Sequence, residues 1–248
     1  AIVIAAAICK FRGIKPVLSP HGMLCDYILH TNNKRKKQFL HPIGGRSLLR
    51  NAFLHVSSAM EWNESQLFLK DVWPGCIIPN LVKSTFHEHG SAKSPGSSLI
   101  IGFLSRIDPK KRLDVLIRAL AEVKFDFRLK IAGDGNDEYL NYLKDVSKAC
   151  CISEKVEWVG WQDNVQKYDF YRSIDLFALL SHNENFGVVV LEALSVGTPV
   201  LLSEGVGISE YVKDKNLGWV TEKDCPDEIA KILELIRMHP EEQMRIQQ

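Results

Sequence analysis

The sequence predicts an α/β protein that consists of two domains with doubly wound parallel sheets. Three observations support this prediction. Short apolar runs alternate with amphipathic helical segments along residues 97–248, the same alternation occurs within residues 1–83, and a segment rich in Ser, Gly and Pro separates the two regions. Strands that alternate with helices imply right-handed crossovers and parallel sheets that are covered on both faces.

The domain boundaries follow from the position of the Ser-, Gly- and Pro-rich segment and from the distribution of charged residues. Residues 1–83 carry 11 Lys and Arg against 4 Asp and Glu, whereas residues 84–248 carry 20 against 26. A basic part joined to an acidic part indicates two units with different surroundings. We therefore predict a first domain at 1–83, a linker at 84–96 and a second domain at 97–248.

The second domain shows the clearer pattern. We predict strands at 99–104, 127–132, 156–159, 175–180 and 199–202, the last of which ends the series. We place helices near 113–120, 139–146, 168–171 and 187–196, and from 227 onward. In such a sheet, ligands bind at the carboxyl ends of the strands.

The first domain begins in the middle of the same pattern. We predict a helix at 1–12 and strands at 16–19, 52–57 and 75–80. The apolar start is shorter than the roughly 20 residues of a membrane-spanning helix, so we expect a buried helix there. Three strands fall short of a doubly wound domain of about 100–150 residues, so we expect the front of this domain to be missing from the sequence.

Composition indicates a globular protein in a reducing compartment. The chain is 46% hydrophobic and 25% charged, with a net charge of +1, and its six cysteines show neither CxxC pairs nor zinc-ligand spacing with histidine. We therefore expect a cytoplasmic protein without disulfides, structural metal or cofactor.

Two segments carry the chemistry. In residues 181–194, Glu184 lies in a loop after an apolar run, Gly187 opens the next helix, and Glu192 lies among apolar residues, where a carboxylate needs a partner. In residues 102–113, Arg106 and Lys111 surround the turn that leaves the first strand of the second domain. Helix starts and paired cations both favour anions. Two glutamates on a solvated helix face, and a solvated basic turn, are the alternative interpretations.

These segments resemble the family 4 (group 1) retaining glycosyltransferases, which have the GT-B fold of two facing Rossmann-like domains. Residues 181–194 resemble the E-x7-E signature of that family, and residues 102–113 resemble its Arg-x4-Lys phosphate clamp, with Arg112 where a glycine is usual. Ser19–Leu24 is similar to the family's Pro-His-Gly-Met loop. The resemblance extends over essentially the whole chain.

The resemblance implies roles for particular residues. Glu184 faces the donor sugar, Glu192 binds the ribose hydroxyls, and Arg106 with Lys111 stabilises the leaving diphosphate. His21 positions the sugar or the acceptor, although a single histidine is more often structural. The remaining donor-binding candidates match turns near the sugar, phosphates and nucleobase: Asn185, Phe186, Gly187, Gly133, Gly160, Trp161, Gly207 and Glu210.

The implied function is retaining transfer of a hexose from a UDP- or GDP-sugar to a hydroxyl of a glycan or lipid-linked acceptor. We expect no metal requirement and a place in polysaccharide or glycoconjugate synthesis. An NDP-sugar epimerase or a sugar phosphorylase on the same architecture, and a non-catalytic nucleotide-sugar-binding module, remain alternatives.

The basic run at 34–37 leaves a further question open. It either docks on an anionic membrane at the inner face or lies on a solvated helix. We expect no nucleic acid partner.

Overall fold

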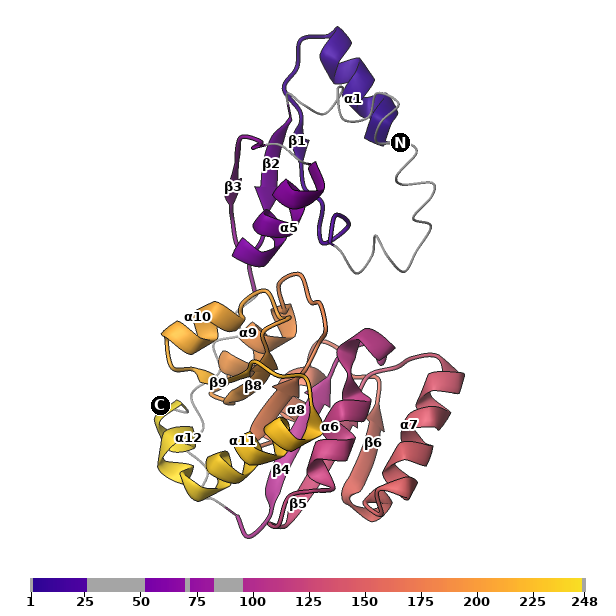
Figure 1. Ribbon diagram of the computed structural model, residues 1–248, viewed down its shortest axis with the longest axis vertical. Coiled ribbons are helices and arrows are strands. Elements are labelled where there is room, and N and C mark those ends of the chain that lie inside the picture. The colour runs from indigo at the N-terminus through magenta and orange to yellow at the C-terminus, as the bar shows by residue number, and fades with distance from the viewer. Residues whose placement is uncertain (1, 26–51, 70–71, 83–95, 247–248) are drawn as a thin grey trace. The chain divides into compact units, whose positions relative to one another are not determined.

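The computed structural model describes residues 2–25, 52–69, 72–82 and 96–246. The chain divides into two compact units, residues 1–81 and 82–248. Each unit contains its own parallel sheet (Figure 1).

The second unit contains a six-stranded parallel sheet in the order β6-β5-β4-β7-β8-β9. Its strands are β4 (Leu99–Leu104), β5 (Phe127–Ala132), β6 (Val156–Gly160), β7 (Leu176–Leu179), β8 (Val200–Ser203) and β9 (Gly218–Thr221). The five predicted strands are confirmed. The prediction that the series ends at residue 202 is wrong, because β9 adds an edge strand beside β8. Its four residues are too short and too mixed to give a clear periodic signal.

The connections reverse direction in the middle of this sheet. The chain runs outward from β4 to β5 and β6, returns to β7 beside β4, and then runs outward to β8 and β9. The loops after β4 and β7 therefore leave neighbouring strands at the point where the strand order reverses. Ligands bind at this switch point in doubly wound sheets, because the connecting helices diverge to opposite faces and leave a crevice.

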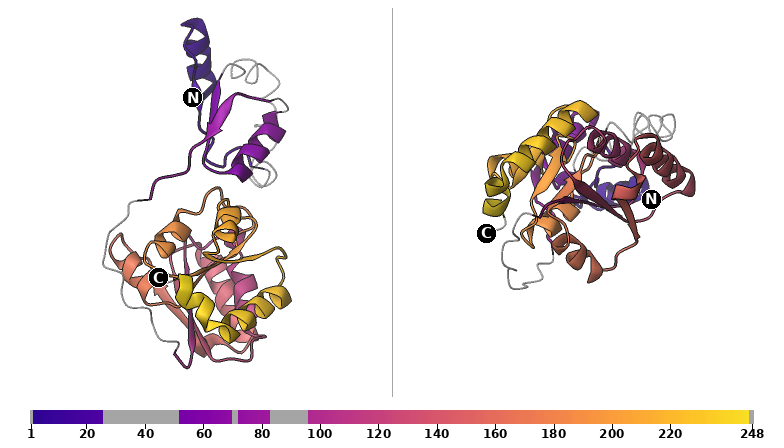
Figure 2. Two further views of the ribbon diagram at one scale, coloured as in Figure 1. Left: turned by 90° about the vertical axis from the view of Figure 1, so that its left-hand side faces the viewer. Right: turned by 90° about the horizontal axis from the view of Figure 1, so that it is seen from below.

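Helices cover both faces of the sheet. They are α6 (Leu113–Leu120), α7 (Asp137–Ala149), α8 (Gln166–Arg172), α9 (Val188–Leu194), α10 (Ser209–Asp214), α11 (Pro226–Met238) and α12 (Pro240–Ile246), with 3-10 turns η2 (Pro109–Lys111) and η3 (Ser153–Lys155). In Figure 1, α6, α7 and α11 lie in front of the sheet and α8 lies behind it; Figure 2 gives the side and end views.

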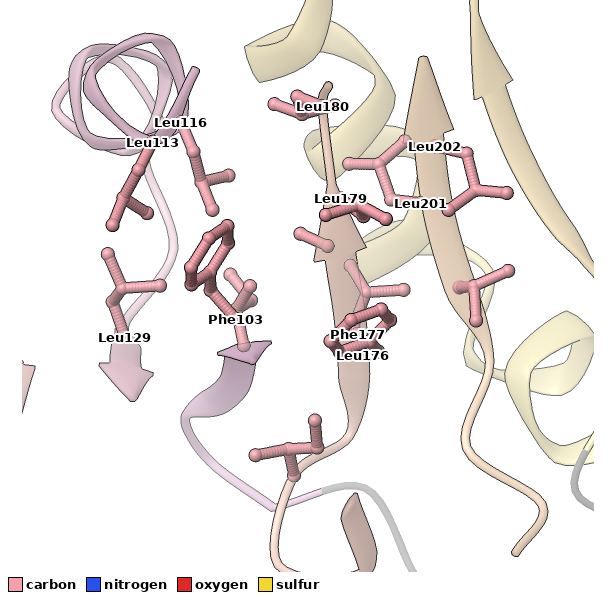
Figure 3. Packing of buried hydrophobic residues seen from close by; sticks show 14 of the residues in the cluster. Phe103, Leu113, Leu116, Leu129, Leu176, Phe177, Leu179, Leu180, Leu201 and Leu202 are labelled. Atoms are coloured by element: carbon pink, nitrogen blue, oxygen red, sulfur yellow. The ribbon is translucent and has the colours of Figure 1, made fainter. Parts of the chain in front are cut away.

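One hydrophobic core holds this unit together. Leu113 and Leu116 of α6 point toward Phe103 of β4 and Leu129 of β5 (Figure 3). Every residue of β7 and β8 is buried, as expected for central strands that are covered on both faces. This packing fixes the strand ends from which the loops of the candidate site emerge.

The first unit has a three-stranded parallel sheet in the order β1-β2-β3. Its elements are α1 (Ile2–Phe11), β1 (Val17–Leu18), β2 (Phe53–Val56), α5 (Ala59–Leu69) and β3 (Gly75–Ile77). The three predicted strands are therefore confirmed. The described part of this unit has a small core of Ala52, Leu69 and Trp73.

Helix α1 is not the buried helix that we expected from its sequence. Ile4 and Ile8 are exposed, and 92% of Phe11 is accessible to solvent. The small core of the described part of this unit does not cover that face. No helix in the described residues is long and apolar enough to cross a membrane. The basic run at 34–37 lies outside the described residues.

Candidate functional site

A short turn after β4 aims Lys111 inward. The Asp108 carboxylate accepts a hydrogen bond from the Lys110 backbone N–H at 3.1 Å and starts the η2 turn. Arg112 then takes a left-handed conformation, with φ 52°. Lys111, the last residue of η2, is only 6% exposed.

Lys111 forms an ion pair with Glu184, which lies in the loop after β7. Burial lowers the pKa of Lys111, whereas the neighbouring Glu184 carboxylate acts in the opposite direction. The positive charges of Lys110 and of the exposed Arg106 lower this pKa further. The structure thus brings Lys111 and Glu184 into contact at the switch point, and Arg106 is close enough to act electrostatically on Lys111.

The loops after β7 and β8 are joined through their backbones. The Glu184 N–H donates to the Gly205 carbonyl at 2.7 Å, and the Gly207 N–H donates to the Glu184 carbonyl at 2.8 Å. A Cβ on Gly205 would lie 2.5 Å from the Ser181 carbonyl oxygen, so only glycine permits this approach. The hydrogen bond from the Gly207 N–H thus holds the backbone of Glu184 in place.

The loops after β5 and β6 form a second joined pair. The Gly133 N–H donates to the Gly160 carbonyl at 2.8 Å. Gly133 has φ 128°, and a Cβ there would lie 1.9 Å from the Ser105 carbonyl oxygen in the loop after β4. Trp161 follows Gly160 and is 72% exposed, so its ring is available for stacking.

Glu192 has the partner that its burial requires. It is 7% exposed on α9, and its carboxylate accepts hydrogen bonds from the Lys167 ammonium and from the Tyr171 hydroxyl at 3.2 Å. Burial and the charge of Glu192 raise the pKa of Tyr171. Sequence reasoning missed both partners, because Lys167 reads as an ordinary surface lysine of α8 and Tyr171 as a core aromatic residue.

The remaining candidates of the second unit differ in their surroundings. Phe186 is buried in the core, so its side chain is structural. Gly187 has φ 89° and precedes α9, a helix of seven residues. Glu210 is exposed in the first turn of α10.

His21 lies in the first unit, and its part in the site stays a prediction. His21 is exposed, and its backbone takes a left-handed conformation with φ 49°. The next residue donates its backbone N–H to Glu61 of α5: the Gly22 nitrogen lies 2.6 Å from Oε1. The same carboxylate accepts from the N–H of Ser57 at 2.8 Å and from its hydroxyl at 3.1 Å. Glu61 is 2% exposed and anchors the His21 loop, which the sequence analysis did not anticipate.

Comparison with known proteins identifies the family. Residues 85–248 match the family described as Glycosyl transferases group 1. An uncharacterised glycosyltransferase of Methanocaldococcus jannaschii is 34% identical over 134 residues, which are 53% of this chain and 34% of that protein. A D-inositol 3-phosphate glycosyltransferase of Streptosporangium roseum is 32% identical over 149 residues, 56% of this chain and 34% of that protein. The chain thus spans about a third of the length of these relatives.

Solved structures share the fold at low sequence identity. Anabaena Alr3699/HepE in complex with UDP and glucose superimposes with a TM-score of 0.79 at 19% identity, over 99% of this chain and 68% of that one. WaaG, a glycosyltransferase involved in lipopolysaccharide biosynthesis, gives 0.72 at 17%, over 89% and 62%. The two parallel sheets of three and six strands match the GT-B fold of these enzymes, as the sequence predicts. With two thirds of its residues within the family match, the chain belongs to the group 1 glycosyltransferase family.

Proposed function

We propose that this chain provides the nucleotide-sugar-binding part of a retaining hexosyltransferase. The reaction moves a hexose from a UDP- or GDP-sugar to a hydroxyl of a glycan or lipid-linked acceptor. Family membership supports glycosyl transfer from a nucleotide-sugar. The ion pair of Lys111 and Glu184 at the switch point carries the rest of the proposal, because it puts a buried cation beside a carboxylate where ligands bind.

The charges at this site suit a diphosphate. Lys111 has already lost most of its hydration, so it meets an incoming phosphate without the full cost of desolvation. An anionic diphosphate would also favour the protonated form of Lys111 and so oppose the effect of burial on its pKa. Arg106, exposed nearby, adds a second cation, and together they would stabilise the charge that grows on the leaving diphosphate.

The neighbouring residues suit the two sugars of the donor. On this proposal Glu184 orients the hexose once Lys111 engages the phosphates, and the backbone of residues 185–187 contacts the sugar. Glu192 binds the ribose hydroxyls, because a carboxylate has about four acceptor positions and two donors occupy only part of them. Trp161 stacks on the nucleobase. Gly133, Gly160, Gly207 and Glu210 line this edge of the sheet.

Two solved structures of similar fold support the donor and acceptor classes. HepE forms a complex with UDP and glucose, which supports a UDP-sugar as the donor of this chain. WaaG is described as acting in lipopolysaccharide biosynthesis, which supports a glycan or lipid-linked acceptor. The leaving diphosphate would help to deprotonate the acceptor hydroxyl on the face from which it departs. His21 would position the acceptor or the sugar.

Ligand binding to the chain itself tests the donor assignment. We expect UDP or GDP to raise its melting temperature, since a ligand at 100 times its Kd adds about 2.7 kcal/mol to stability. Lys111→Ala should remove most of that shift. Lys148→Ala, an exposed lysine of α7, should preserve the shift. If neither nucleotide shifts the melting temperature of the wild type, the proposed donor site is wrong.

Product analysis separates transfer from its alternatives. The full-length protein is incubated with UDP- and GDP-hexoses and a panel of sugar acceptors. A new glycosidic product with retained anomeric configuration supports the proposal. Formation of an epimerised nucleotide-sugar without acceptor would instead indicate an epimerase. Formation of a sugar phosphate from inorganic phosphate would indicate a phosphorylase.

A further inference from the structure

Lys111 and Arg112 are neighbours in sequence but reach toward different loops. Lys111 contacts Glu184 after β7, whereas Arg112 contacts Asp224 after β9. The Arg112 guanidinium donates from Nη1 to the Asp224 carboxylate at 2.9 Å and from Nη2 to the Asp224 backbone carbonyl at 2.9 Å. Two parallel hydrogen bonds to one residue fix the direction of the guanidinium as well as its distance.

The backbone of Arg112 explains why this turn needs support. Arg112 has φ 52° and ψ 38°, a left-handed conformation that residues with a Cβ rarely adopt. It ends η2, where its N–H donates to the Pro109 carbonyl at 3.0 Å, and it also precedes the first residue of α6. The side-chain contact with Asp224 joins this left-handed turn, directly after Lys111, to the loop after β9.

A third loop reaches the same turn. The His182 N–H donates to the Lys110 carbonyl at 2.8 Å, and the His182 ring lies 4.0 Å from the Asp224 carboxylate. The loops after β4, β7 and β9 therefore meet around η2. A displacement of Arg112 would move the Lys110 carbonyl and loosen the loop that carries Glu184.

We propose that Arg112 and Asp224 are positioning residues, which hold the turn after β4 so that Lys111 points at Glu184. The proposal rests on the proposed function for its consequence: the same turn then sets the affinity of the site for the diphosphate of the donor. Neither Arg112 nor Asp224 needs to touch the ligand.

The competing interpretation is an ordinary surface ion pair. The two side chains are partly exposed, and exposed pairs contribute little to stability. A surface pair would affect neither Lys111 nor ligand affinity, and it would not depend on the backbone of residue 112. Glycine adopts the left-handed conformation without penalty, so Arg112→Gly separates the two interpretations.

The experiment is a cycle of variants of the whole chain: wild type, Arg112→Gly, Asp224→Ala and the double variant. Affinity for inorganic pyrophosphate and for UDP is measured by calorimetry. We expect Asp224→Ala to weaken both about tenfold, which corresponds to about 1.4 kcal/mol. In the Arg112→Gly background the same substitution should change affinity less than about twofold, because glycine holds the turn by itself. Asp214→Ala, an exposed carboxylate on α10, controls for the lost charge.

A readout without ligand keeps the test independent of the proposed function. The pKa of the Lys111 side chain, followed by NMR, should return toward its ordinary value in Asp224→Ala and stay lowered in the double variant. Equal effects of Asp224→Ala in both backgrounds, or no effect on Lys111 in either, would overturn the inference. If the wild type binds neither pyrophosphate nor UDP or GDP while the Lys111 pKa still responds as expected, the proposed function fails and the positioning role stands.

Discussion

The ammonium of Lys167 on α8 donates a hydrogen bond to the carboxylate of Glu192 on the neighbouring helix α9. The pair is largely buried, with side-chain exposures of 19% and 9%. Removing one partner of a buried pair leaves an uncompensated charge, which costs more than the pair itself contributes. Four predictions follow from this pair and from three other contacts.

Lys167→Met should destabilise the second unit by about 2 kcal/mol, less than the ~3–5 kcal/mol typical of fully buried pairs, because Lys167 retains some contact with water. Urea unfolding measures the change. Adding Glu192→Gln should recover part of the loss by removing the unpaired charge. Lys148→Met, an exposed lysine of α7, is the control and should lie within about 0.5 kcal/mol of the wild type. A Lys167→Met variant as stable as this control would contradict the prediction.

Lys111→Met should alter how stability depends on pH. The pKa of Lys111 is lowered in the folded state, so between that lowered value and the ordinary value of 10.5 the unfolded chain binds more protons than the folded one. The free energy of unfolding of the wild type should therefore rise with pH within this window, relative to Lys111→Met. Urea unfolding from neutral pH to 10.5 tests the sign. A difference that falls with pH would mean that the Glu184 carboxylate outweighs burial.

Gly133→Ala and Gly160→Ala should differ although both residues have positive φ. A Cβ on Gly133 would lie 1.9 Å from the Ser105 carbonyl oxygen, whereas a Cβ on Gly160 would meet nothing within 4 Å. We expect a loss of about 3 kcal/mol for Gly133→Ala from overlap and strain, against about 1 kcal/mol for Gly160→Ala from backbone strain alone. Thermal or urea unfolding decides the point. Equal losses would show that conformation, not close approach, dominates at both positions.

Glu61→Gln should loosen the loop that carries His21. The carboxylate accepts from the Gly22 N–H and from two donors of Ser57, and an amide keeps only one of its two acceptor oxygens. We expect a loss of about 2 kcal/mol from the buried donors left unsatisfied. Hydrogen exchange should show a faster Gly22 amide in this variant. In Asn63→Ala, a change at an exposed position of the same helix, the Gly22 amide should exchange at the wild-type rate.

All strands but β9 could be predicted from short apolar runs, most clearly β7 and β8, which are buried along their whole length. The missed strand β9 lies at the edge, where Trp219 and Val220 are only partly buried, so its pattern is weak. The segments around Lys111 and Glu184 were recognisable as local motifs. The family resemblance implied that both segments lie around the same diphosphate, but their direct ion pair had no sign in the sequence, because it joins residues 73 positions apart.

The supporting residues escaped sequence reasoning for a related reason. Glu61 and Lys167 are polar residues in helices, and such residues are usually solvated. Only the tertiary structure brings Glu61 to the backbone of Gly22, 39 positions away, and Lys167 to Glu192, 25 positions away. The left-handed conformation of Arg112 could be suspected from the sequence, since the family motif that this segment resembles has glycine at that position. The anchor of Arg112, Asp224, lies 112 positions away and had no such sign.

The close approach of glycine backbones around the switch point has a practical consequence for redesign. Gly133 lets the loop after β5 rest on the loop after β4, and Gly205 lets the loop after β8 rest on the loop after β7, so these loops have little room to shift. If the proposed donor site is right, altered sugar or nucleobase preference would then come from exchanged side chains on an unchanged backbone. Combinatorial libraries that vary Asn185 and Trp161 should yield mostly folded members, whereas libraries that vary the two glycines should yield mostly insoluble ones.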